Sequence, residues 1–233
     1  MRVTLPGHPA SGKAGADGVV PISARDRRAD RKAAVHSRIL KSAREIFFRD
    51  GFNEASLDEI ASRAETGKGT LYRHFESKAE LYVAVLAENG TAFEERMRES
   101  VSGDGPAIER IRQIGLFYRR YWLDHPEHFG IFWAVHSQAF IGELSRPMLE
   151  EVTRIWESPL RLVEQILTEG MERGEVRACD PWVMANVIWR TGNSAVEALV
   201  TPKRARVVDC SPEPIFRTTL DLILAGLRPE PAQ

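Results

Sequence analysis

The chain has 233 residues, of which 43% are hydrophobic and 28% charged, proportions that are typical of a folded globular protein and exclude wholesale disorder. No apolar stretch approaches the roughly 20 residues of a membrane span, and the first 21 residues lack the apolar region of a signal peptide. Two cysteines without a CxxC spacing indicate free thiols in a reducing compartment, so we expect a soluble, cytoplasmic protein.

The net charge of -1 conceals an asymmetry along the chain. Residues 25–78 carry 13 Lys and Arg against 9 Asp and Glu, whereas residues 79–233 carry 17 against 23. A basic front and an acidic back indicate two functions in one chain. The basic part is a candidate for binding a polyanion such as nucleic acid, although many domains with such an excess bind none.

Residues 1–28 are rich in Gly, Ala, Ser, Pro and Arg and have no usable periodicity, which predicts a disordered tail. Basic residues follow one another where the tail meets the rest of the chain. They either lie along phosphates or are solvated: Arg25, Arg27, Arg28, Arg31 and Lys32.

Helical spacing of apolar residues begins after the tail and continues to Gly51, which is expected to end the first helix as a C′ glycine. Ser56 and Glu59 have the spacing of a capping box that opens a short helix. Residues 65–67 are a tight connection to a second short helix. Another capping box, Ser77 to Glu80, opens a fourth helix.

The rest of the chain is also expected to be helical, and no segment has the alternation of a strand. Pro159 is expected to kink or split one of these helices. The fold class is therefore all-α. The predicted longer helices cover about 106–125, 147–173, 180–200 and 214–227.

Two short helices joined by a tight turn, within residues 56–75, have the pattern of a helix-turn-helix motif. The second helix can enter a DNA major groove, while Leu71 and Phe75 face the domain core. Ser56 and Lys78 are plausible phosphate clamps. For each outward residue the alternative is a solvated helix face. The outward residues of the second helix are Lys68, Gly69, Thr70, Tyr72, Arg73 and His74.

These outward residues have different expected roles. Lys68, at the helix start, is expected to bind phosphate, and Gly69 lets the backbone approach a base edge. Thr70, Tyr72 and His74 supply a hydroxyl, a phenol and an imidazole. Arg73 can read guanine through two hydrogen bonds, which makes it a candidate for specificity.

The motif Lys68-Gly69-Thr70-Leu71-Tyr72-Arg73-His74-Phe75, followed by Ser77-Lys78 and Leu81, strongly resembles the tetracycline-repressor (TetR/AcrR) family over about 50 residues. The resemblance implies an all-helical homodimer. An N-terminal three-helix domain would bind an operator in double-stranded DNA, and a C-terminal helical bundle would bind a small-molecule effector. The last two helices, about 180–200 and 214–227, would form the dimer interface.

This resemblance divides the chain into a tail (1–28), a helix-turn-helix domain (29–78) and a ligand-binding and dimerisation domain (79–233). It also implies a transcriptional regulator, most simply a repressor that its effector releases from a palindromic operator. One departure from the family pattern is Glu65-Thr66-Gly67, where a Gly-Val-Ser-like turn is usual. Thr66 is able to take over capping, and Glu65 is expected to point away from DNA.

The C-terminal part is rich in aromatic residues, which either line a pocket for an apolar or planar ligand or form the core. The pocket candidates are Phe117, Tyr121, Trp122, Phe132, Trp133, Trp156 and Trp189.

We expect no metal, because the spacing of Asp124, His125, Glu127, His128 and His136 matches no strong site. No nucleophile–base pair or nucleotide-binding loop is present, so we expect neither an enzyme nor a cofactor. A redox pair formed by the two cysteines, Cys179 and Cys210, is a minor alternative. A helical interaction module without DNA binding is the other, and duplex binding that depends on salt separates it from a regulator.

Overall fold

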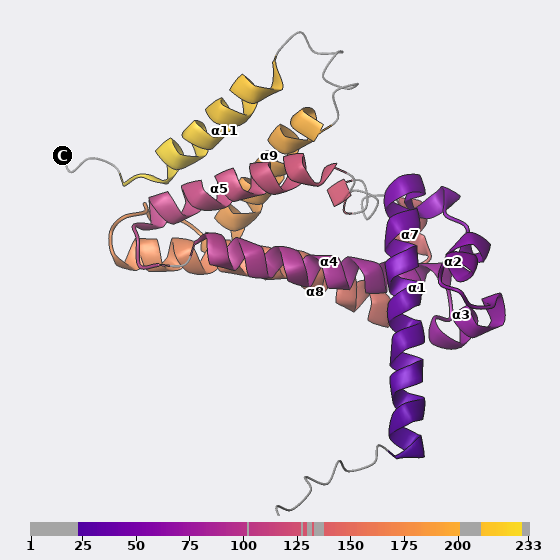
Figure 1. Ribbon diagram of the computed structural model, residues 1–233. Coiled ribbons are helices and arrows are strands. Elements are labelled where there is room, and N and C mark those ends of the chain that lie inside the picture. The colour runs from indigo at the N-terminus through magenta and orange to yellow at the C-terminus, as the bar shows by residue number, and fades with distance from the viewer. Residues whose placement is uncertain are drawn as a thin grey trace, which may run out of the picture.

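The computed structural model describes residues 23–101, 103–126, 128–129, 132, 138–200 and 211–229. Within these ranges every regular element is an α-helix, as Figure 1 shows, and the prediction of an all-α fold is confirmed. None of the helices in these ranges is long and apolar enough to cross a membrane.

The first three helices and the start of the fourth enclose one apolar core. They are α1 (Ala24–Glu54), α2 (Leu57–Arg63), α3 (Lys68–His74) and α4 (Lys78–Ser100). Burial of apolar side chains from all four is what holds such short helices in place, because α2 and α3 are too short to be stable alone. The most buried members include Ile39, Ala43, Ile46, Phe47, Ile60, Leu71, Leu81 and Tyr82.

Helix α1 begins at Ala24, so the prediction of a disordered tail as far as residue 28 is wrong over residues 24–28. The Ser23 hydroxyl accepts from the Asp26 N–H at 3.1 Å, and the Asp26 carboxylate accepts from the Ser23 N–H at 3.2 Å. This capping box satisfies two of the free donors of the first turn. The charged residues after it lack an apolar stripe, which is why periodicity did not detect the helix. Residues 1–22 lie outside the described residues.

Gly51 interrupts the helical backbone of α1 with a φ of 75°, a left-handed conformation that glycine adopts without strain. The break was predicted from the sequence. It allows the following residue, Phe52, to turn into the core, where its ring packs edge-on against Tyr82 at 5.1 Å between ring centroids.

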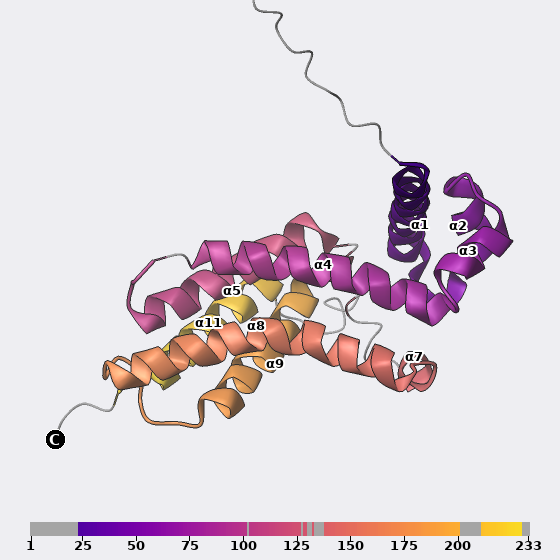
Figure 2. The same cartoon turned by 90° about the horizontal axis from the view of Figure 1, so that it is seen from below.

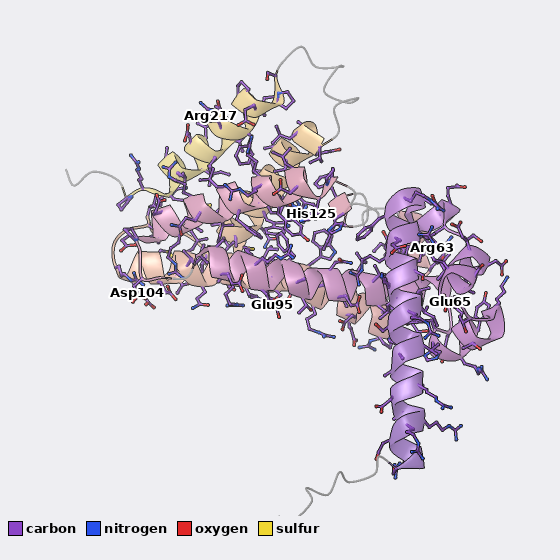
Figure 3. The ribbon with its side chains drawn as sticks, viewed as in Figure 1. Arg63, Glu65, Glu95, Asp104, His125 and Arg217 are labelled. Carbon is purple, nitrogen blue, oxygen red and sulfur yellow. The ribbon has the colours of Figure 1, made fainter. Side chains whose placement is uncertain are left out.

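The connection between α2 and α3 is a Schellman motif centred on Glu65. The Glu65 N–H donates to the Ser62 carbonyl at 3.1 Å, and the Thr66 N–H donates to the Ala61 carbonyl at 3.0 Å. This motif requires a left-handed residue at its centre, and Glu65 has a φ of 52°. Glu65 (Figure 3) is therefore strained at a position that glycine usually occupies.

Replacing Glu65 with Gly is expected to raise the free energy of unfolding by about 0.5–1 kcal/mol, because the left-handed strain is removed at a smaller entropic cost. Thermal denaturation measures this as an increase of about 1–4 °C in Tm. The matched control is Glu65→Gln, which removes the charge and keeps the strain. An equal gain in both variants would show that the charge, and not the backbone, destabilises the turn.

The remaining helices form a second, larger apolar core. They are α5 (Ala107–Asp124), α7 (Gln138–Gly142), α8 (Arg146–Glu172), α9 (Pro181–Val200) and α11 (Pro212–Leu227). The short α7 was not predicted, since five residues carry no measurable period, and α11 starts two residues earlier than expected. Helix α8 is continuous through Pro159, so the predicted split is absent. Both halves of α8 are held because they pack along the same bundle, against α4, α5 and α9.

Helix α4 belongs to both cores. Its first half buries Tyr82 and Leu86 in the N-terminal core, and its second half buries Phe93 and Met97 in the C-terminal one. Figure 2 shows α4 and α8 running side by side from the bundle to the N-terminal helices, and they are in extensive contact. Helix α4 therefore connects the two cores through one continuous element.

Candidate nucleic-acid interface

Helix α3 presents one face to the core and the other to solvent. Leu71 is completely buried and Phe75, its C-cap, is 3% exposed, as predicted. The opposite face carries Lys68, Gly69, Tyr72 and Arg73, all of them exposed. In Figure 1, α2 and α3 lie on the outer side of the N-terminal domain, away from the C-terminal helices, so this face is open to a macromolecule.

Lys68 is tied to α2. Its ammonium lies 2.9 Å from the Asp58 carboxylate, and this hydrogen-bonded pair raises the pKa of Lys68 above its ordinary value. The side chain is thus held beside the α2–α3 junction, with its remaining donors in solvent. A phosphate at this place would compete with Asp58 for the ammonium.

Arg73 and Thr70 are linked on the exposed face. The Arg73 guanidinium donates to the Thr70 hydroxyl at 2.7 Å, which orients the planar group along the helix and leaves its other N–H donors available. Tyr72, one position before Arg73, is 46% exposed and contributes an apolar ring with a polar tip. Together they offer the donors and apolar surface that base edges recognise.

His74 is less accessible than its neighbours in α3. Its ring lies 5.7 Å from that of His36 in α1, and His36 in turn stacks on Phe75 at 4.8 Å. Burial, and then electrostatic interactions with His36, Lys32 and Arg73, lower the pKa of His74. This lowered pKa favours the neutral imidazole at pH 7.

Ser56 and Lys78, the two residues predicted as phosphate clamps, each make a hydrogen bond within the domain. The Ser56 hydroxyl caps α2 by accepting from the Glu59 N–H at 3.4 Å, and its own hydrogen remains free to donate. The Lys78 ammonium donates to the Asn53 carbonyl at 2.8 Å and lies over the Phe52 ring. Burial lowers the pKa of Lys78. Lys78 thus fastens the end of α1 to the start of α4.

The capping boxes predicted at Ser56 and Ser77 are each half-formed. The Glu59 side chain bonds Arg49 at 2.9 Å instead of returning to the cap, and this ion pair lowers the pKa of Glu59. At the second site the Ser77 hydroxyl accepts from the Glu80 N–H at 3.0 Å. The Glu80 carboxylate accepts from the N–H of Glu76, one residue before the cap.

The aromatic pocket candidates fall into two groups. Phe117 and Tyr121 pack on Phe93, at 5.5 and 4.9 Å between ring centroids, and line no described cavity. The others line a small cavity of about 20 Å³, while Trp133 lies outside the described residues. The members of this lining group are Trp122, Phe132, Trp156 and Trp189.

The cavity also contains a polar pair that the sequence did not reveal. The Tyr118 hydroxyl donates to the Asn193 side-chain carbonyl, and both residues are buried. Burial raises the pKa of Tyr118, so the phenol stays protonated. The buried indole N–H of Trp189 makes no hydrogen bond with any described residue. Asn193 occupies a core position of α9. An Asn within the apolar stripe of a helix was the sequence signal that could have identified this buried polar pair.

A second cavity, of about 50 Å³, adjoins the first, since Tyr118 and Trp189 line both. It lies among α5, α8, α9 and α11. Its wall is almost entirely apolar, formed by Ile111, Ile114, Val163, Ile188, Phe216, Leu220 and Ile223.

The described residues contain no group of three or more His, Cys, Asp or Glu side chains that could hold a metal ion. Of the residues considered for one, His125 and His128 stack on each other at 4.9 Å between ring centroids. Glu127 and His136 lie outside the described residues. Cys179 is a free thiol 4.0 Å from the Met171 sulfur, and Cys210 is also outside the described part of the chain.

Residues 39–85 match the family model of bacterial regulatory proteins of the tetR family. A fatty acid metabolism regulator protein of Bacillus subtilis is 23% identical over 151 residues, which cover 63% of this chain and 73% of that relative. The transcriptional repressor BepR of Brucella suis is 25% identical over 62% of this chain and 69% of its own length.

The solved structures agree in fold. The crystal structure of the transcriptional regulator FadR from Bacillus subtilis in complex with stearoyl-CoA has a TM-score of 0.65 and 20% identity, covering 82% of this chain and 99% of FadR. These relatives are transcriptional regulators and not enzymes. The residues that match the family model run from α1 into α4 and include the exposed α3, so the N-terminal part of the chain is similar to bacterial regulatory proteins of the tetR family.

Proposed function

We propose that the protein is a cytoplasmic, ligand-responsive repressor that binds a palindromic operator as a homodimer and is released by a small-molecule effector. The observation that carries the proposal is the exposed face of α3. It combines Lys68, Tyr72 and Arg73 on a helix whose other side, Leu71 and Phe75, is anchored in the core. Repression is also the activity named for the relative BepR.

Each of the two apolar cores belongs to a domain with its own proposed function. Residues 29–78 bind DNA, with α3 in the major groove and Ser56 and Lys68 at phosphates, while residues 79–233 bind the effector and dimerise. Thr70, Tyr72, Arg73 and His74 face the base edges, and Gly69 lets the backbone come close. Lys78 supports this surface by joining α1 to α4. Its positive charge also attracts the phosphates of the DNA.

Dimerisation through α9 and α11 is supported by apolar side chains that these helices leave in solvent. Val183 and Val187 are 56% and 48% exposed and stand one helical turn apart on α9. Leu222 on α11 is 68% exposed. Helices α9 and α11 pack against each other and form a two-helix unit that carries all three side chains. A second copy on this surface forms a four-helix interface and sets the spacing of the two α3 helices.

We assign the effector to the class of molecules with a long apolar chain and a hydrogen-bond acceptor, such as a long-chain acyl-CoA. The apolar wall among α5, α8, α9 and α11 suits the chain, and the free indole N–H of Trp189 suits a carbonyl. The structural relative FadR is in complex with stearoyl-CoA.

The size of the two small cavities supports a mechanism for such an effector. Ligand sites usually measure about 300–1,000 Å³, so these two cavities hold a ligand of this class only after side chains of the bundle move. We expect the effector to bind such a rearranged state more tightly than the packed one. The effector therefore shifts the population away from the packed state, and α4 transmits the change to the DNA-binding domain.

Fluorescence anisotropy with a duplex selected for binding tests this proposal. Stearoyl-CoA is expected to release the duplex, whereas free coenzyme A at the same concentration is not. A Trp189→Phe variant is expected to need more stearoyl-CoA. Release by coenzyme A alone would contradict the apolar site, and a rise of reporter transcription when the protein is supplied would contradict repression.

The Asp58–Lys68 pair yields a separate prediction. Asp58→Asn is expected to tighten DNA binding, because it frees the Lys68 ammonium for phosphate and removes a negative charge. Lys68→Ala is expected to weaken binding to all sequences alike and to reduce the slope of log affinity against log salt by about one unit. Salt titrations of both variants measure this. A salt slope that Lys68→Ala leaves unchanged would exclude a phosphate contact.

A further inference from the structure

The first three turns of α1 project beyond the N-terminal core as a free helical arm, residues 24–35, which Figure 1 shows extending past α3. Residues 25–34 are all exposed, so packing on the rest of the described chain does not stabilise the arm. A helix that buries no apolar face is only marginally stable. We therefore expect a binding partner outside the described chain to stabilise the helical conformation of the arm.

One face of the arm is strongly basic and lies beside α3. With the exposed face of α3 it forms an open groove of about 720 Å³. The groove is lined by four cations of the arm and by Arg73, and by no Asp or Glu among the described residues. The lining side chains of the arm are Arg25, Arg28, Arg31 and Lys32, and α3 contributes Thr70, Arg73 and His74.

The spacing of these cations is unfavourable for the isolated protein. Arg28 is three residues from Arg25 and from Arg31 and four residues from Lys32, so like charges are neighbours on the helix surface and repel. None of the four makes an ion pair within the described part of the chain, whereas most arginines of the bundle have a carboxylate partner there. An anion in the groove removes this repulsion.

We propose that the arm and α3 together clamp the sugar–phosphate backbone of one DNA strand, next to the major groove that α3 enters. This inference rests on the proposed function and extends its binding site. Arg25 to Lys32 span about 10 Å along the helix, close to the axial rise of three nucleotides of one strand. Arg73 lines the groove and also lies on the exposed face of α3 that is proposed to read DNA. We therefore infer that the same duplex DNA occupies the groove.

The test uses the full-length protein with Arg25→Gln, Arg28→Gln and Arg31→Gln combined, since Gln keeps the helix propensity of the arm. The slope of log affinity against log salt is expected to fall by about two to three units, with a loss of affinity of about 10- to 100-fold at low salt. The loss is expected to be equal for the selected duplex and for one with altered bases, because phosphate contacts carry no sequence information.

Two controls accompany this variant. Arg27→Gln removes a charge from the same arm but outside the groove lining, and Arg154→Gln, Arg161→Gln and Arg173→Gln remove three charges from the bundle. Both are expected to keep the wild-type slope within about one unit. The triple arm variant is also expected to keep its Tm, because the three substituted side chains are exposed.

The outcomes separate this inference from the function on which it rests. If the wild-type protein binds a selected duplex through Tyr72 and the arm variant keeps the wild-type slope, the arm is not a clamp and the proposed function stands. If the wild-type protein binds no duplex, the proposed function fails and the inference with it. If the salt slope falls equally in the triple bundle variant, the effect of the arm variant is due to net charge alone. This result would contradict the clamp.

Discussion

Replacing Val187 and Leu222 together with Asp is expected to convert a dimer into monomers and to lower the affinity for the selected duplex at least about 100-fold. Each exposed apolar side chain would otherwise be buried against the second copy, and an unpaired carboxylate there costs several kcal/mol in desolvation. A monomer contacts only one half of a palindromic site and loses the contribution of the second recognition helix. Light scattering measures the first effect, as a mass near the 26.2 kDa of one chain, and anisotropy the second.

The matched control for this variant is Leu149→Asp, on α8. Leu149 is also an exposed apolar side chain, with 43% of its surface accessible against 48% for Val187 and 68% for Leu222. It lies on α8 and not on α9 or α11. It is expected to leave both the mass and the affinity unchanged. A double variant that remains dimeric would place the interface elsewhere. A monomeric wild-type protein that binds a palindrome with full affinity would contradict dimeric recognition altogether.

Replacing Tyr72 with Ala is expected to weaken binding to the selected duplex by about 10- to 100-fold, the size of one good base contact. The ring is 46% exposed and lies on the side of α3 opposite the buried Leu71, so the Tm is expected to stay within about 1–2 °C of the wild type. A titration of labelled duplex, together with thermal denaturation, separates loss of contact from loss of fold.

The variant Tyr72→Phe divides this effect between the ring and the hydroxyl. Intermediate affinity would show that both take part, while full affinity would assign the contact to the ring against a base methyl or sugar. Unchanged affinity in Tyr72→Ala would show that Tyr72 does not contact DNA. Leu71→Ala, one residue away but in the core, is expected to lose binding by destabilising the domain by about 2–5 kcal/mol.

The elements that sequence analysis predicted well are those in which several local signals agree. Gly51 ends a run of helical spacing, Ser56 caps the next helix, and Leu71 and Phe75 occupy the inward positions of α3; all are found in the structure. The bundle helices were predicted for the same reason, since each has an apolar stripe that begins near a proline or a cap.

The parts that were not predicted depend on contacts between distant residues. The arm at the start of α1 has a cap but no apolar stripe, so its composition resembled a tail. The hydrogen bond from Lys78 to the Asn53 carbonyl was not predicted, because Asn53 lies 25 residues earlier in the chain. Nor does spacing distinguish Trp189, which lines both cavities, from Phe117, which packs on Phe93. The separation of core from cavity requires the packed structure.

Selection of bound sequences from a library of random DNA duplexes tests the central claim most directly. Sequencing of the retained duplexes is expected to show a palindrome with half-sites about one helical turn apart, and its enrichment should disappear with Tyr72→Ala. Such a site would also identify the regulated gene. Retention of all sequences alike, with no enriched site and no effect of Tyr72→Ala, would contradict a sequence-specific regulator that reads DNA through α3.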